Sequence, residues 1–61
     1  MNNEQKKAFA EYLHRDGIRC PISAEPELGD RRDEPTYIVA WEFTNGSRMI
    51  MGIEPDGSRH T

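Results

Sequence analysis

Residues 36–54, with the sequence TYIVAWEFTNGSRMIMGIE, decide the fold of this chain. Two apolar segments, Tyr37–Phe43 and Arg48–Ile53, flank the dipeptide Asn45-Gly46. An Asn-Gly pair between two such segments is the strongest short-range signal for a β-hairpin. The stretch therefore predicts two antiparallel strands that supply most of the hydrophobic core.

The register of this hairpin depends on the length of its loop, because a shift of one residue moves every side chain to the opposite face of the sheet. A two-residue loop would leave both faces largely apolar. A three-residue loop, Thr44–Gly46, with its glycine left-handed in a bulge, pairs Glu42 with Arg48 and Trp41 with Met49. We prefer the three-residue loop because the hydrophobic pattern, the cross-strand charges and the turn chemistry then agree.

In this register the two faces of the hairpin differ in chemistry. The first face is apolar and carries Tyr37, Val39, Trp41, Phe43, Met49, Met51 and Ile53. The second face is mixed and carries Thr36, Ile38, Ala40, Glu42, Arg48, Ile50, Gly52 and Glu54. We expect the first face to form the core.

A helix is predicted before the hairpin. Asn2 or Asn3 can cap it, and Gln5, three residues after Asn2, completes a capping-box pattern. Gly17 is expected to end the helix in a left-handed conformation. The apolar stripe of this helix consists of Ala8, Phe9, Tyr12 and Leu13.

A short strand is predicted after the helix, because Ile18, Cys20 and Ile22 alternate with polar residues. Cys20 then points toward the core as a small hydrophobic residue. Pro21 cannot donate a hydrogen bond to a neighbouring strand, so this strand belongs at the edge of the sheet.

The expected fold class is α+β, with one N-terminal helix packed on a three-stranded antiparallel sheet in the order αβββ and in two layers. Residues 1–61 form a single small domain. Within it, residues 25–35 form an acidic loop, and residues 55–61 form a turn and a frayed C-terminal tail.

Composition limits the classes of function. The chain has 61 residues, of which 34% are hydrophobic and 31% are charged, so a homodimer or a bound partner is expected to bury additional surface. Cys20 is the only cysteine, which excludes an internal disulfide bond and fits a reducing compartment. There is no signal-like segment or long apolar segment, so we expect a cytoplasmic protein without membrane contact.

The net charge of −3 comes from one acidic segment that includes the loop. Beside a sheet edge, such acids can steer a partner with a basic surface. The mixed face of the hairpin adds an apolar patch that can serve as an interface. The predicted partner-binding residues are therefore Glu25, Glu27, Asp30, Asp33, Glu34, Ile38, Ala40 and Ile50.

No reaction centre is recognisable. No nucleophile, base and orienting group can be assigned together, so catalysis is not expected. His14, Cys20 and His60 are the only soft metal ligands, and they lack the paired spacing of a zinc site. We therefore expect neither a metal nor another cofactor.

No motif of a known family is present. In size, acidic charge and lack of catalytic residues, the chain resembles small acidic inhibitor proteins encoded by phages and mobile elements, including anti-CRISPR proteins. The resemblance implies an inhibitor or regulator that occupies a macromolecular surface, and we expect a non-enzymatic protein-binding module. The alternative is a nucleic-acid-binding module that uses the sheet aromatics with Lys6-Lys7 and Arg31-Arg32, although these basic residues form two small pairs and not a stripe.

Overall fold

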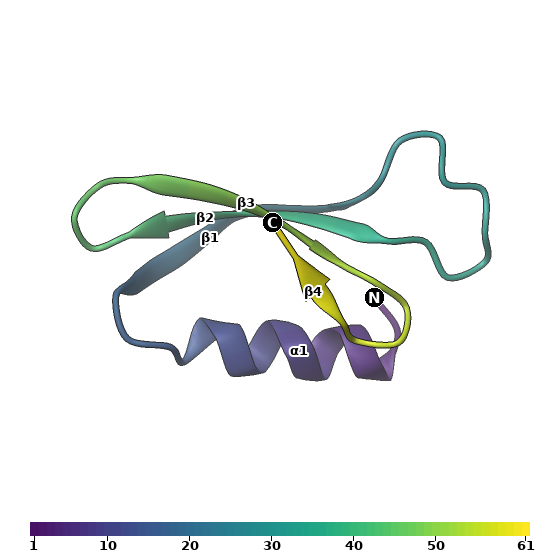
Figure 1. Ribbon diagram of the computed structural model, residues 1–61, viewed down its shortest axis with the longest axis horizontal. Helices are drawn as coiled ribbons and strands as arrows, with labels where there is room; N and C mark the ends of the chain where they lie inside the picture. Colours follow the sequence, from purple (N-terminus) through teal and green to yellow (C-terminus); the bar gives the residue numbers. More distant parts are fainter.

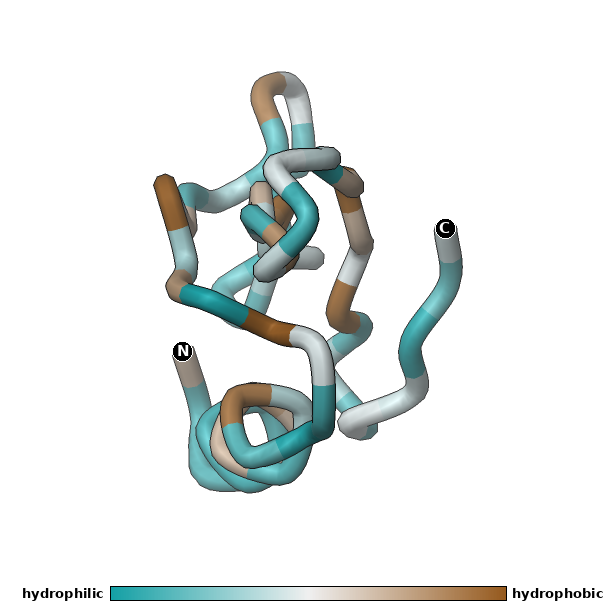
Figure 2. The backbone as a smooth tube through the Cα atoms, turned by 90° about the vertical axis from the view of Figure 1, so that its left-hand side faces the viewer, coloured by the Kyte–Doolittle hydropathy of each residue, from teal (hydrophilic) through white to brown (hydrophobic).

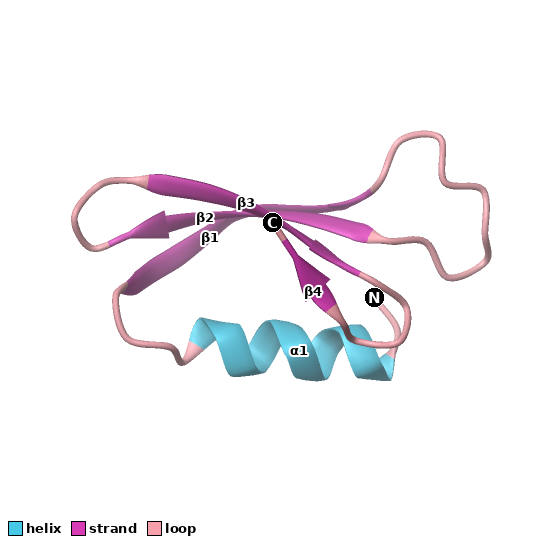
Figure 3. Ribbon diagram, viewed as in Figure 1, coloured by secondary structure: helices cyan, strands magenta, loops and turns pink.

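The computed structural model describes residues 1–61 as one helix and one antiparallel sheet (Figure 1). The helix is α1 (Asn3–Leu13), and the strands are β1 (Ile18–Pro26), β2 (Tyr37–Phe43), β3 (Arg48–Ile53) and β4 (Arg59–His60), adjacent in that order. The helix and the strands form two layers (Figure 3), and the end-on view of Figure 2 shows the helix beneath the strands. The α+β class is therefore confirmed.

The sheet has four strands, whereas the sequence predicts three. The additional strand, β4, lies within the segment that is expected to be a turn and a tail. Arg59 pairs with Ile53, and His60 pairs with Gly52. The imidazole of His60 covers Gly52, where a Cβ atom would come within 2.5 Å of the ring. The absence of a side chain at Gly52 therefore gives the final strand room to pack.

The turn before β4 has the same chemistry as the turn between β2 and β3. Their sequences are TNGSR at 44–48 and PDGSR at 55–59. In each, the Asn45 or Asp56 side chain accepts hydrogen bonds from the serine two residues later, at 2.9 Å from its N–H and 2.6 Å from its hydroxyl. The following glycine has a φ of 86° or 88°. The turn expected in residues 55–61 is therefore present, but it leads into a paired strand and not into the predicted frayed tail.

The predicted register of the β2–β3 hairpin is confirmed. Glu42 lies opposite Arg48, and Trp41 lies opposite Met49. The loop closes with a hydrogen bond of 2.8 Å from the Phe43 N–H to the Ser47 carbonyl. The charge pairing differs from the expected one, because Glu42 forms its ion pair with Arg19 at 3.7 Å.

The helix begins as predicted, with Asn2 and Gln5 forming a capping box. Its buried face is rotated relative to the predicted stripe, because Gln5, Ala8 and Tyr12 are the buried residues. Leu13, the last helical residue, remains 38% exposed. Gly17 has the expected positive φ but lies in the turn after the helix, not at its cap.

The core lies between α1 and the aromatic face of the sheet, as predicted. Trp41 is fully buried, and its ring centroid lies 5.1 Å from that of Phe9 and 5.2 Å from that of Tyr12. These tilted aromatic pairs add stabilisation beyond the burial of their surface. The buried hydrophobic residues are Ala8, Tyr12, Val39, Trp41, Met51 and Ile53.

Strand β1 is an edge strand, as Pro21 predicts. Its register with β2 shifts twice, between Ile18 and Cys20 and between Pro21 and Ser23. The first shift places Cys20 opposite Glu42, on the mixed face of the sheet, where it is exposed. The expectation that Cys20 points into the core is therefore wrong, because a bulge interrupts the alternation on which it depends.

Candidate protein-binding surface

The acidic loop is closed at its base and projects from one end of the sheet (Figure 1). The N–H of Glu27 donates a hydrogen bond of 2.8 Å to the carbonyl of Thr36. Glu25, predicted to lie in this loop, instead belongs to β1 and faces Ile38 across the strands. The loop proper therefore begins at Glu27, and Glu25 stands beside it on the mixed face of the sheet.

Asp30 organises the loop from within. Its carboxylate accepts hydrogen bonds from the N–H groups of Arg32 and Thr36, at 3.1 and 3.0 Å, and from Arg32 Nε at 2.9 Å. The hydrogen bond from the Arg32 side chain and that from the Thr36 backbone hold the pKa of Asp30 far below its usual range. Because this pKa is lowered on folding, the ionised Asp30 carboxylate stabilises the folded protein at pH values above its unfolded pKa. That stabilisation declines as the pH falls below the unfolded pKa and is lost as the pH falls through the folded pKa.

The network continues from Thr36 to the C-terminal strand. The hydroxyl of Thr36 accepts a hydrogen bond from Arg32 Nη2 and donates one to Glu54 Oε1, each at 2.9 Å. The same Glu54 oxygen lies 3.1 Å from His60 Nε2. The hydrogen bond from Thr36, and then that from His60, lowers the pKa of Glu54. These contacts tie the loop to β3 and β4, so the loop has a defined shape.

The predicted acids are thus of two kinds. Asp30 serves the structure, since its side chain is only 10% exposed and is paired with Arg32. The other predicted acids make no ion pair; these free acids are Glu25, Glu27, Asp33 and Glu34. All four are exposed, and Arg31 is the cation among them that also lacks a carboxylate partner. The charge available to a partner is therefore negative.

Leu28 is a feature of this loop that the sequence pattern does not predict. Its side chain is 98% exposed, the highest value among the exposed large hydrophobic residues. It lines a hollow of about 300 Å³ together with Glu25, Glu27 and Ile38, which joins the loop to the mixed face. An apolar side chain surrounded by charges has the arrangement of a binding anchor with a polar rim. A single leucine in a polar stretch gives no periodic signal from which this exposure could be predicted.

The three apolar residues predicted to bind a partner lie on the mixed face of the sheet. Ile50 is 65% exposed, whereas Ile38 and Ala40 are half-buried. Ile50 pairs with Ala40 across the hairpin, and Ile38 faces Glu25 of β1. The loop and the mixed face are therefore continuous through Ile38 and Glu25.

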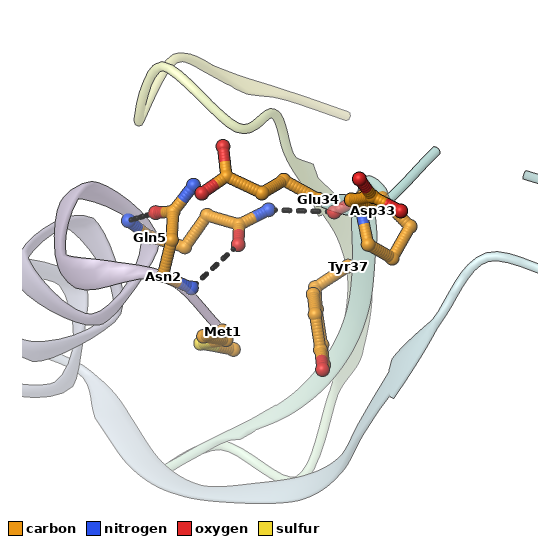
Figure 4. Close-up of a pocket in the computed structure, with 7 residues that line it drawn as sticks. Met1, Asn2, Gln5, Asp33, Glu34 and Tyr37 are labelled. Carbon is orange, nitrogen blue, oxygen red and sulfur yellow. Dashed lines mark hydrogen bonds between the residues drawn. The ribbon is translucent and has the colours of Figure 1, made fainter. Parts of the chain in front are cut away.

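A second hollow, of about 280 Å³, lies where the helix meets the end of the loop (Figure 4). Its lining includes Gln5 with the Asp33 and Glu34 carboxylates and the Tyr37 ring. Gln5 is buried, and its Nε2 donates hydrogen bonds to the carbonyls of Pro35 at 2.8 Å and Ile53 at 3.1 Å. Gln5 thus connects the helix to the end of the loop and to β3, and this hollow lies at that contact.

The residues of the nucleic-acid alternative are arranged differently from an exposed stacking platform. Trp41 is fully buried, and Tyr37 and Phe43 are half-buried. Arg32 is bound to Asp30, which reduces the positive charge of the Arg31-Arg32 pair. Single-strand binders need aromatic faces that bases can reach.

His14, Cys20 and His60 are not brought together into a metal site, and no group of three or more metal-ligating side chains occurs. The single helix, α1, is too short and too polar to cross a membrane. Comparisons of the chain with models of known protein families, with curated proteins and with solved structures found no match.

Proposed function

We propose that this protein is a non-enzymatic binding module that docks on a basic surface of another protein. The observation that carries the proposal is Leu28, a fully exposed leucine on a loop whose shape is held by Asp30 and Arg32. A preorganised loop loses little conformational entropy on binding, so its anchor contributes more affinity. The free acids around the anchor select a positively charged partner.

An inhibitor or regulator is the role that fits this chemistry. Docking alone can block the partner's surface without any reaction at the interface. The resemblance in size and charge to small acidic inhibitors of phages and mobile elements suggests the same role. Capture from the native host, followed by mass spectrometry, identifies the partner, and variants of the loop then test the surface.

Replacing Leu28 with asparagine should weaken partner binding by about 30-fold or more, the effect of losing one hot-spot residue of about 2 kcal/mol. Thermal stability should change little, because the side chain makes almost no contact within the chain. The matched control is Leu13→Asn, which changes the same residue type at the end of the helix. Binding measured by surface plasmon resonance that is equal for Leu28→Asn and wild type would contradict the proposal.

Replacing the free acids Glu25, Glu27, Asp33 and Glu34 with their amides should slow association with the partner markedly at low salt. The slowing should be much smaller at high salt, where the charges are screened over a few ångströms. Asp30 is kept in this variant because it shapes the loop. Stopped-flow association rates at several salt concentrations measure the effect, and identical rates at low salt would show that the acids do not steer the partner.

We also propose that the protein self-associates through the outer edge of β3. Strand β4 pairs only with Gly52 and Ile53, so the stretch from Arg48 to Met51 has an open edge. The other sheet edge, β1, carries Pro21 and two register shifts, which discourage strand pairing. An open strand edge beside the exposed Ile50 favours a symmetric homodimer.

Replacing Ile50 with glutamate should convert this dimer to a monomer. The new charges would lie close together across a two-fold interface and would be costly to desolvate. Sedimentation at micromolar concentration should give twice the monomer mass for wild type and for the control Ile22→Glu on the opposite edge strand. A wild-type protein that is strictly monomeric under these conditions would remove the proposal.

A further inference from the structure

Two arginines from distant parts of the sequence lie against the same aromatic ring. The guanidinium carbon of Arg15 is 5.2 Å from the centroid of the Tyr12 ring, and that of Arg59 is 5.7 Å from it. Arg15 follows α1, and Arg59 belongs to β4. The final hairpin therefore brings two positive charges together beside the helix.

Neither arginine has a carboxylate partner. The ion pairs of the chain use Arg19, Arg32 and His60, all within 4.0 Å of a carboxylate oxygen. Arg31 and Arg48 also lack a carboxylate partner, but Arg15 and Arg59 differ from them in lying against one aromatic ring. The Tyr12 ring offsets part of their repulsion by cation–π attraction, but it supplies no hydrogen-bond acceptor to the guanidinium groups.

The two arginines line a hollow of about 220 Å³. Its other walls are Tyr12, Met51, His60 and Thr61. Among the lining residues, His60 contacts Glu54 through Nε2 at 3.1 Å, which occupies one nitrogen of the imidazole. The hollow thus combines an apolar floor with donors that have no acceptor within the chain.

We propose that this hollow binds a phosphate dianion, either free phosphate or the phosphate of a phosphomonoester. Guanidinium groups bind phosphate oxygens through two parallel hydrogen bonds, and two of them match the double negative charge. The hollow is below the usual volume of a site for a drug-sized ligand, so it suits a single tetrahedral group. The inference is independent of the proposed docking function, because Leu28 and the free acids lie outside this hollow.

The test is a titration of the protein, monitored by NMR at pH 7.5, with inorganic phosphate, O-phosphoserine and acetate as separate probes. Both phosphate probes should shift and saturate the signals of Tyr12, Arg15 and Arg59 together, with those of Arg48 unchanged. Arg15→Gln and Arg59→Gln should each weaken phosphate binding about tenfold, the loss of a charge-assisted interaction. Arg48→Gln removes an arginine that lies outside the hollow and should leave binding unchanged.

The wild-type titration tests the site even if a variant fails to fold. Shifts at Arg48 as large as those at Arg15 and Arg59 would overturn the proposal, because they would indicate non-specific attraction to any cation. Acetate binding as tightly as phosphate would also overturn it in favour of a carboxylate site. Tighter binding of O-phosphoserine than of inorganic phosphate would identify a phosphomonoester as the source, and equal or weaker binding would identify free phosphate.

Discussion

Replacing Gln5 with glutamate should destabilise the protein by about 3 kcal/mol or more at pH 7, because the two hydrogen bonds that its amide nitrogen donates are lost and a negative charge is placed against two carbonyl oxygens. The Gln5 amide nitrogen donates to the carbonyls of Pro35 and Ile53, and a carboxylate there would repel both oxygens. The total stability expected for 61 residues is only about 3–9 kcal/mol, at about 0.05–0.15 kcal/mol per residue. The substitution therefore removes a large part of the stability.

The penalty of this variant should shrink at low pH. Burial against two carbonyl oxygens raises the pKa of the introduced carboxyl group above its unfolded value of about 4.3. A group whose pKa is raised on folding stabilises the folded state below the unfolded pKa and loses that contribution as the pH rises through the folded pKa. Urea titrations of variant and wild type, followed by fluorescence of Trp41, should thus converge as the pH is lowered toward 4.

Two further variants separate charge from hydrogen bonding. Asn3→Glu adds the same charge to an exposed position in the first helical turn, where it should change stability by less than about 0.5 kcal/mol. Gln5→Ala removes the hydrogen bonds without adding a charge, and its penalty should not depend on pH in this range. A Gln5→Glu variant within 1 kcal/mol of wild type at pH 7 would show that this side chain does not join the helix to the loop and sheet.

Replacing Trp41 with alanine should cost about 3–5 kcal/mol, the usual penalty for deleting a large buried aromatic side chain. The Trp41 side chain is completely buried and contacts the rings of Phe9 and Tyr12. The variant should lose most of its cooperative unfolding transition in circular dichroism. A matched control is Tyr37→Ala on the same strand and face, where a half-buried ring should give a smaller loss.

Trp41→Phe should reduce the stability by less than the loss of side-chain volume alone predicts. The indole Nε1 is buried without a hydrogen-bond partner, and removing an unsatisfied donor recovers part of its desolvation penalty.

The Trp41 variants also distinguish the protein-binding proposal from the nucleic-acid-binding alternative. A Trp41→Ala protein that stays folded but loses affinity for single-stranded nucleic acid would support the stacking alternative and contradict a core role for this residue.

Local chemistry predicts much of the fold. Asn45-Gly46 with a three-residue loop gives the hairpin register, and Asn2 with Gln5 gives the helix start. Both features arise from interactions between residues only a few positions apart, so they can be predicted from the sequence without knowledge of the tertiary structure. The aromatic face follows from the register because side chains alternate along a strand.

The site is predicted less well, because its residues act through contacts distant in sequence. The acids of the loop are visible in the sequence, but only the fold shows that Asp30 is paired with Arg32 and linked through Thr36 to Glu54. Leu28 is likewise seen to be exposed only in the folded chain. A list of charges cannot distinguish a carboxylate that shapes a loop from one that faces a partner.

The sequence by itself determined the β2–β3 register, the helix cap and the placement of the aromatic residues in the core, since each follows from short-range geometry. Only the tertiary structure decided that Gln5 is buried, that Cys20 is exposed by a bulge, and that β4 brings Arg59 beside Arg15. The physical reason is that a polar side chain can be buried only where distant carbonyls accept its hydrogen bonds, as Pro35 and Ile53 do for Gln5.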